Sequence, residues 1–198
     1  MSNAIYKLIY FIELVIISIV RSLGTTKYRN VSTVNERGST LDTILLALNG
    51  VGMIVPIVYV CSSVLDFADY SLPDWLRWIG VLMFAAASVM LWMTHRDLGR
   101  NWTPTLGLRE EHTLITEGIF KYIRHPMYAA HLLWAIAQPL ILTNWIAGFS
   151  FLIPQIPQYL LRIEDEEQMM LDQFGTQYQD YMDRTGRFLP RFTKPESA

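Results

Sequence analysis

Cysteine and charge are both scarce in this sequence of 198 residues. Cys61 is the single cysteine, so an internal disulfide is excluded, and its apolar surroundings indicate a small core residue. Charged residues make up 17% of the chain, whereas ordinary soluble domains carry roughly 25%. The formal net charge of −2 gives no sign of a basic surface, so we expect no nucleic-acid partner. The chain is too apolar for a typical soluble domain of its size.

The short motifs of several common enzyme classes are also missing. His125 and His131 are six residues apart, which places them on different faces of a helix, and no His-x-x-x-His or Cys-x-x-Cys pair occurs. We therefore expect no metal. No serine or cysteine stands in a nucleophile elbow, and there is neither a Walker loop nor a Gly-x-Gly-x-x-Gly sequence. A nucleotide bound in a conventional fold is not expected.

Three long stretches, residues 43–65, 78–95 and 125–161, contain no Asp, Glu, Lys or Arg. Because about 20 apolar residues cross a bilayer as a helix, each of the first two stretches predicts one spanning helix. The third is long enough for two. A Thr-Asn pair near its middle predicts a tight hairpin of helices over roughly 126–142 and 145–161.

Residues 4–20 form a weaker candidate for a fifth span, because Glu13 would lie in the middle of the helix and must face a partner helix or a polar cavity. We therefore expect an all-α integral membrane protein with about five transmembrane helices. The whole chain, 1–198, forms one membrane domain, with N-terminal helices in 1–94 and the motif-bearing part in 95–198.

The basic residues indicate how the chain is oriented. Lys and Arg are concentrated in loop 21–41, in loop 95–125 and in the C-terminal tail, whereas loop 66–74 carries three Asp and no basic residue. Loops rich in Lys and Arg tend to stay in the cytoplasm. We therefore expect a multi-pass protein with its N-terminus outside and with its active site and C-terminus in the cytoplasm.

A polar cluster, Arg124-His125-Pro126-Met127-Tyr128, opens the third apolar stretch. Proline is tolerated at the first helical position, so Pro126 predicts the start of a helix. Arg124 and His125 then lie at the N-terminus of this helix, and we expect their backbone N–H groups to be free. Tyr128 lies three residues past His125 and faces the same side. In a purely structural interpretation, Arg124 ends a loop and Tyr128 belongs to an aromatic belt at the membrane surface.

Two further segments carry polar residues at informative spacing. The long segment 95–121, in which Gly99 is placed to end a helix, is apolar enough to predict a folded cytoplasmic lid. In the tail, Arg162 and Glu166 are four residues apart on one helical face, either as a functional pair or as a weak surface salt bridge. Phe174-Gly175 predicts the end of that helix.

Taken together, these motifs resemble the isoprenylcysteine carboxyl methyltransferase family over roughly residues 95–190. The resemblance is carried by the order and spacing of several motifs: His95-x-Asp97-Leu98-Gly99-x-x-Trp102, Glu117-Gly118-Ile119-Phe120-Lys121-Tyr122-Ile123, Arg124-His125-Pro126-x-Tyr128, Arg162-x-x-x-Glu166-Glu167 and Phe174-Gly175-x-x-Tyr178-x-x-Tyr181. Each motif is weak alone. The chain length is similar to that of the compact prokaryotic members, and the N-terminal third carries no motif.

The resemblance implies an S-adenosylmethionine-dependent carboxyl O-methyltransferase that acts on a lipophilic acceptor entering between helices from the membrane. Its cofactor pocket would be formed by the cytoplasmic ends of the last helices, the loop before them and the C-terminal helical tail. Arg162 and Glu166 would lie beside the reacting group, as the catalytic pair. The implied cofactor contacts are His95, Leu98, Gly99, Gly118, Ile119, Arg124, His125, Tyr128 and Glu167.

The side-chain chemistry suits this assignment. A carboxylate is already ionised at neutral pH, so methyl transfer to it needs no general base, and alignment is the main task. Arg162 is suited to clamp the acceptor carboxylate with two hydrogen bonds, and Glu166 could hold that guanidinium. Arg124 could take the carboxylate of the cofactor and Glu167 its amine. Aromatic faces such as Tyr128 or Trp102 would favour the sulfonium.

Other functions stay open on the sequence alone. Within the methyltransferase reading, the acceptor could be a prenylcysteine carboxylate, another isoprenoid acid or a phospholipid amine. A membrane sterol or isoprenoid reductase would use NADPH instead, although the acidic run 164–167 and the few basic residues near Arg124 disfavour a phosphate clamp. A non-enzymatic scaffold is the third reading. The roles of Glu13, His112 and His131 default to structural ones.

Overall fold

The computed structural model describes residues 2–26, 33–34, 39–101, 108–109 and 113–191, and its described part is almost entirely helical. The α-helices are α1 (Asn3–Thr26), α2 (Thr40–Cys61), α3 (Asp74–Leu98), α4 (Pro126–Leu142), α5 (Trp145–Phe149), α6 (Leu152–Phe174) and α7 (Thr176–Arg184). Short 3-10 helices cover Asp66–Ala68, Gly99–Asn101 and Gly118–Lys121. The two-residue strands β1 (Thr33–Val34) and β2 (Leu108–Arg109) pair antiparallel, with Thr33 opposite Arg109.

The helices confirm the expected class of membrane protein. By length and composition, α1, α2 and α3 can each cross a membrane, and α4 is a shorter apolar helix of 17 residues. The described chain thus has three clear candidate spans, and the expected number of about five stays a prediction. Glu13 in α1 is 9% exposed, as expected for a carboxyl group that turns away from lipid.

The predicted hairpin is correct in its first half and wrong in its second. Helix α4 begins and ends where expected, and Thr143 (φ 48°) and Asn144 form the break, with Asn144 capping α5 through the N–H groups of Ile146 and Ala147. The expected helix over 145–161 instead divides into α5 and α6. Pro154 lies in the first turn of α6, where a proline is tolerated, so it is compatible with a new start at Leu152. The helix continues past Pro157, which lies inside it, to Phe174.

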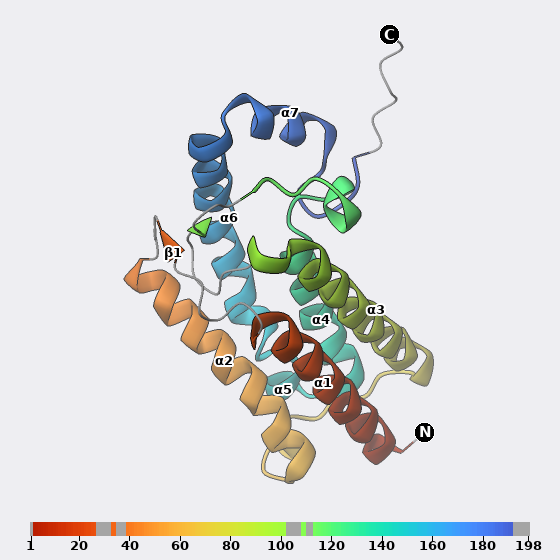
Figure 1. Cartoon of the computed structure of the whole chain (residues 1–198). Coiled ribbons are helices and arrows are strands. Elements are labelled where there is room, and N and C mark those ends of the chain that lie inside the picture. Colours follow the sequence, from red (N-terminus) through yellow and green to blue (C-terminus); the bar gives the residue numbers. More distant parts are fainter. Residues whose placement is uncertain (1, 27–32, 35–38, 102–107, 110–112, 192–198) are drawn as a thin grey trace.

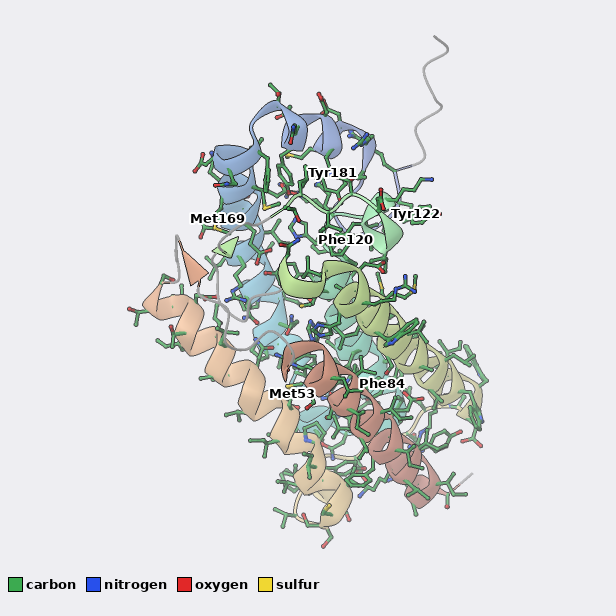
Figure 2. The ribbon with its side chains drawn as sticks, viewed as in Figure 1. Met53, Phe84, Phe120, Tyr122, Met169 and Tyr181 are labelled. Atoms are coloured by element: carbon green, nitrogen blue, oxygen red, sulfur yellow. The ribbon has the colours of Figure 1, made fainter. Side chains whose placement is uncertain are left out.

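An aromatic core holds α1, α3 and α4 together. The rings of Phe84 and Trp134 are stacked with centroids 5.2 Å apart, and Tyr10 and Phe151 pack against them. The Tyr10 hydroxyl donates to Gln138 Oε1 at 2.8 Å, which satisfies a polar pair inside the bundle. Phe84 lies among the bundle helices in Figure 2, whereas Phe120 and Tyr181 lie at the far end, beside α7.

The segments that carry the sequence motifs gather at one end of the molecule. In Figure 1 the end of α6, all of α7 and the segment containing Gly118–Lys121 lie at the top, opposite the N-terminus. Arg124 belongs to this end, because its guanidinium donates to the carbonyl of Met182 in α7. The expected orientation stays a prediction. Lys27, Arg29, Arg37 and Lys194 also entered that prediction, and they lie outside the described residues.

Two glycines of α2 provide a matched test of the packing. A Cβ atom at Gly52 would lie 2.9 Å from the carbonyl carbon of Ser150 and 3.0 Å from Phe151 Cα, whereas a Cβ at Gly50 would meet nothing within 4 Å. We expect Gly52→Ala to destabilise the protein by about 1–3 kcal/mol, because the α2 backbone must move away from Ser150. Gly50→Ala should be neutral or stabilise by up to about 1 kcal/mol. Thermal unfolding in detergent measures both, and equal melting temperatures would contradict this packing.

Candidate active site

The start of α4 is held by the C-terminal tail. His125 is the N-cap and Pro126 the first helical residue, as the sequence predicts. The backbone N–H of Arg124 donates to Gly186 O at 2.8 Å, and that of His125 donates to Arg187 O at 3.0 Å. The expectation that these two N–H groups are free is therefore wrong, because the tail returns after α7 and pairs with residues 123–125.

Three cationic side chains surround the buried carboxylate of Glu167. Arg124 Nε lies 3.0 Å from Oε1, His125 Nε2 lies 3.2 Å from Oε1, and Arg187 Nη2 lies 2.7 Å from Oε2. Burial raises the pKa of the Glu167 carboxyl, but hydrogen bonds from His125, Arg187 and Arg124 outweigh this effect and lower the pKa to about 2. Glu167 therefore stays charged and joins α6, the start of α4 and the tail.

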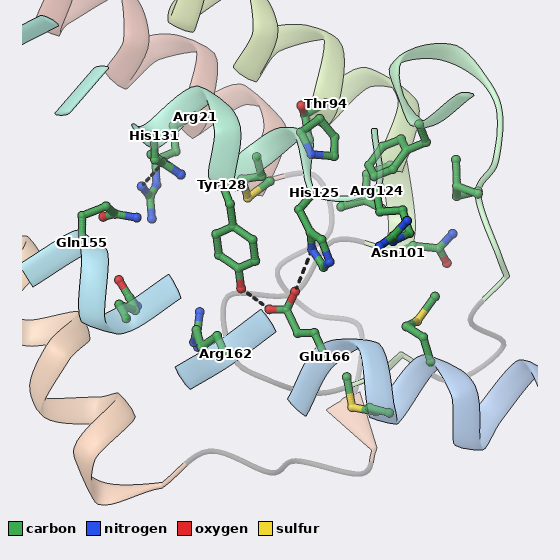
Figure 3. Close-up of a pocket in the computed structure, with 18 of the residues that line it drawn as sticks. Arg21, Thr94, Asn101, Arg124, His125, Tyr128, His131, Gln155, Arg162 and Glu166 are labelled. Atoms are coloured by element: carbon green, nitrogen blue, oxygen red, sulfur yellow. Dashed lines mark hydrogen bonds and ion pairs between the residues drawn. The ribbon is translucent and has the colours of Figure 1, made fainter. Parts of the chain in front are cut away.

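Its neighbour Glu166 faces a different set of side chains. Its Oε1 accepts a hydrogen bond from the Tyr128 hydroxyl, and its Oε2 lies 3.6 Å from His125 Nδ1 (Figure 3). The Tyr128 ring packs edge-on against Tyr159, with centroids 4.9 Å apart. Burial lowers the pKa of His125, but hydrogen bonds to Glu166 and Glu167 more than reverse this and raise it. His125 thus bridges both carboxylates.

Arg162 pairs with Asp42 of α2, and the expected pairing with Glu166 is wrong. Arg162 Nε lies 2.6 Å from Asp42 Oδ1, Nη2 lies 3.1 Å from Oδ2, and both side chains are buried. Ser39 caps α2 and accepts from the Asp42 N–H, so the first turn of α2 presents the carboxylate directly to α6. A planar guanidinium prefers such a two-pronged partner to a carboxylate on its own helix.

The glycine motifs shape the loop between α3 and α4. Gly118 has φ of 60°, and a Cβ there would overlap the carboxylate of Asp97, which accepts from the Ile119 N–H at 2.8 Å. Gly99 (φ 53°) ends α3. Ile119 is buried beside Phe120, and the ring of His95 lies against Gly24 of α1. These residues therefore position the loop and α1.

A cavity of about 330 Å³ connects these groups. It extends from the polar end at Arg124 and His125, past Tyr128, Arg162 and Glu166, to residues of α1 and α2. Six of the sequence-predicted site residues line it: Leu98, Arg124, His125, Tyr128, Arg162 and Glu166. Five others lie outside its lining: His95, Gly99, Gly118, Ile119 and Glu167. Trp102 and His112 lie outside the described residues.

Several lining residues were not predicted from the sequence. They are Arg21, Asn49, Gln155 and Gln158. Tyr178 and Tyr181 belong to a motif that carried the resemblance but had no predicted role in the site, and His131 lines the cavity although a structural role was expected. Polar residues within apolar helices were the available signal, because such residues usually face a partner or a cavity. Among the residues that the structure describes, no group of three His, Cys, Asp or Glu side chains could hold a metal ion.

Comparison with known proteins gives one consistent result. The model of the isoprenylcysteine carboxyl methyltransferase (ICMT) family matches residues 78–172. Protein-S-isoprenylcysteine O-methyltransferase B of Arabidopsis thaliana is 25% identical over 154 residues, which cover 76% of this chain and 78% of the relative. The enzyme of the same name from Dictyostelium discoideum is 31% identical over 108 residues, which cover 54% of this chain and 46% of the relative.

A solved structure shares the fold. The eukaryotic intramembrane Ras methyltransferase ICMT is 25% identical and superposes with a TM-score of 0.55, covering 92% of this chain and 62% of that one. The chain thus spans less than two thirds of the solved protein and about half of the Dictyostelium relative. The resemblance was expected over residues 95–190, whereas the family model matches residues 78–172 and so ends before α7. The structural match covers 92% of the chain and therefore also includes most of the N-terminal helices.

The bridging histidine predicts a pH dependence of stability. Because the pKa of His125 is raised above its ordinary value of 6.5, its contribution to stability is fully present below pH 6.5 and is lost as the pH rises through the raised pKa. We expect the melting temperature of the ligand-free wild type to fall over this range more than that of His125→Gln. The titratable groups that contact the ring are Glu166, Glu167 and Tyr128. Parallel pH profiles of the two proteins would contradict the assignment.

Proposed function

Because this chain belongs to the isoprenylcysteine carboxyl methyltransferase family, we propose that it is an S-adenosylmethionine-dependent methyltransferase. Its acceptor would be the carboxylate of a lipophilic molecule at the membrane, prenylcysteine-like or another isoprenoid acid. The observation that carries the proposal is the cavity, which joins the start of α4, the part of α6 that carries Arg162 and Glu166, and the interior of the helix bundle. The expected orientation would place the polar end of this cavity on the cytoplasmic side.

The polar end of the cavity has the chemistry to hold the methyl donor. Tyr128, Tyr178 and Tyr181 line it, and aromatic faces attract a sulfonium cation. Arg124 also lines it. Its Nε donates to Glu167, and its Nη1 donates to the carbonyls of Met182 and Thr185. Nη2 is therefore left for a ligand carboxylate. We assign Glu167 a positioning role, because it holds Arg124 and His125 without lining the cavity.

The reacting region requires alignment more than proton transfer. When bound, S-adenosylmethionine supplies a methyl group activated by its attachment to a positively charged sulfur. A carboxylate acceptor is ionised at neutral pH, so the surrounding residues need to orient it. Asp42 fixes Arg162 through Nε and Nη2, which leaves Nη1 for the acceptor. Glu166 holds Tyr128 and His125 at the same point of the cavity.

The direct test compares ligands and acceptors on purified protein. Calorimetry should show binding of S-adenosylhomocysteine and no binding of NADPH, because the cations near Arg124 are engaged by Glu167 and cannot clamp an additional phosphate. Labelled methyl from S-adenosylmethionine should appear on an N-acyl S-prenylcysteine and not on its methyl ester. Binding of NADPH alone would favour the reductase reading. Transfer to a phospholipid amine would replace the carboxyl acceptor.

The Asp42 and Arg162 pair generates a second test. Arg162→Ala should abolish methyl transfer while S-adenosylhomocysteine still binds, because Arg162 faces the acceptor. Asp42→Asn should lower kcat/KM by about 10- to 100-fold with unchanged cofactor affinity, because a guanidinium that loses a charged hydrogen-bond partner is no longer held in position. Asp165→Asn is the control, since Asp165 is exposed on the same helix as Arg162. Loss of cofactor binding in Asp42→Asn would contradict this division of roles.

A further inference from the structure

The inner end of the cavity contains a second pair of cation-capable side chains. Arg21 of α1 and His131 of α4 both line it, and Arg21 Nη1 lies 3.4 Å from His131 Nε2. In Figure 3 the two side chains point toward each other, with Gln155 of α6 beside them. His131 lies three residues after Tyr128 on α4, so this pair is about one helical turn from the contact between Tyr128 and Glu166.

The charge of Arg21 distinguishes it from the other arginines of the cavity. Arg162 is paired with Asp42, and Arg124 is paired with Glu167. Within the described part of the chain, by contrast, no carboxylate forms an ion pair with Arg21, and its polar contact is with His131. A cation inside a membrane helix is costly, so its position beside a cavity indicates a functional role.

A second polar side chain in the same cavity has one atom without a hydrogen-bond partner among the described residues. Asn49 of α2 lines the cavity and is 6% exposed. Its Nδ2 donates to Gln158 Oε1 at 2.6 Å and to Leu45 O at 2.9 Å, but its Oδ1 accepts no hydrogen bond from the described residues. A buried acceptor of this kind costs free energy unless something donates to it. The cavity is therefore suited to a ligand with a polar group and not to a hydrocarbon chain alone.

We propose that Arg21 and His131 form an anion subsite that holds the carboxylate of the acceptor on the membrane side of Arg162. The inference rests on the proposed function and adds a specificity-determining residue from the N-terminal part of the chain, before the segment that matches the family model. Asp42 already occupies Nε and Nη2 of Arg162, so Arg162 alone cannot make a two-pronged contact with a carboxylate through those two groups. Arg21 supplies the missing positive charge.

The test uses the full chain in detergent and an N-acyl S-prenylcysteine as acceptor. Arg21→Gln should raise the KM for this acid by about 10- to 100-fold, because a hydrogen bond to a charged group is lost. The affinity for S-adenosylhomocysteine should be unchanged. Arg21→Lys should recover part of the loss, and His131→Gln should raise KM in the same direction. Lys121→Gln, which removes one exposed positive charge outside the cavity lining, should behave as wild type.

Inhibition by the neutral methyl ester of the same molecule separates charge recognition from packing. Arg21→Gln should leave the inhibition constant of the ester unchanged while KM for the acid rises. Equal weakening of acid and ester, or an Arg21→Gln variant that matches Lys121→Gln, would overturn the subsite. A wild type that transfers no methyl group to the acid would instead refute the proposed function. If Arg21→Gln does not fold, as judged by its melting curve, Arg21→Lys with the same pair of ligands decides between these outcomes.

Discussion

The burial of the Glu167 carboxylate is the constraint on which the rest of the site depends. Arg124, His125 and Arg187 reach it from the start of α4 and from the tail, while the carboxylate itself belongs to α6. Removal of one partner of a buried ion pair typically costs about 3–5 kcal/mol, so these segments are strongly held in one arrangement. This arrangement keeps Tyr128 of α4 and Arg162 of α6 on facing helices, and the cavity lies between them and extends into the helix bundle.

The membrane fold was predictable from the distribution of charge along the sequence. The error in that prediction has a local cause. The uncharged stretches of the sequence predicted helices α2, α3 and α4, and the structure confirms the predicted break at Thr143-Asn144. The second helix of the hairpin was misplaced because its apolar stretch does not show where the chain turns. Between α5 and α6, the Ser150 hydroxyl donates a hydrogen bond to the carbonyl oxygen of Gly52 in α2, and only the folded bundle brings these two groups together.

The candidate site was predictable where its parts are close in sequence and not where they meet across helices. The spacing of His125 and Tyr128, and that of Arg162 and Glu166, predicted one helical face for each pair. The family resemblance implied that they belong to the site, and all four line one cavity. The predicted partner of Arg162 was wrong because the spacing of four residues identifies neighbours on one helix only. Asp42 lies on another helix, 120 positions earlier in the sequence. Arg21 was likewise missed, since nothing local connects it with His131.

The unpaired charge at the inner end of the cavity has a consequence for turnover. Under the proposed function, an acid that enters from the bilayer would be attracted by Arg21, and methylation would convert it into an uncharged ester. The ester can no longer offset the cost of burying that arginine, so the reaction itself removes the attraction that brought the acceptor in. Lipid, which is the better solvent for the ester, would then be the destination of the product.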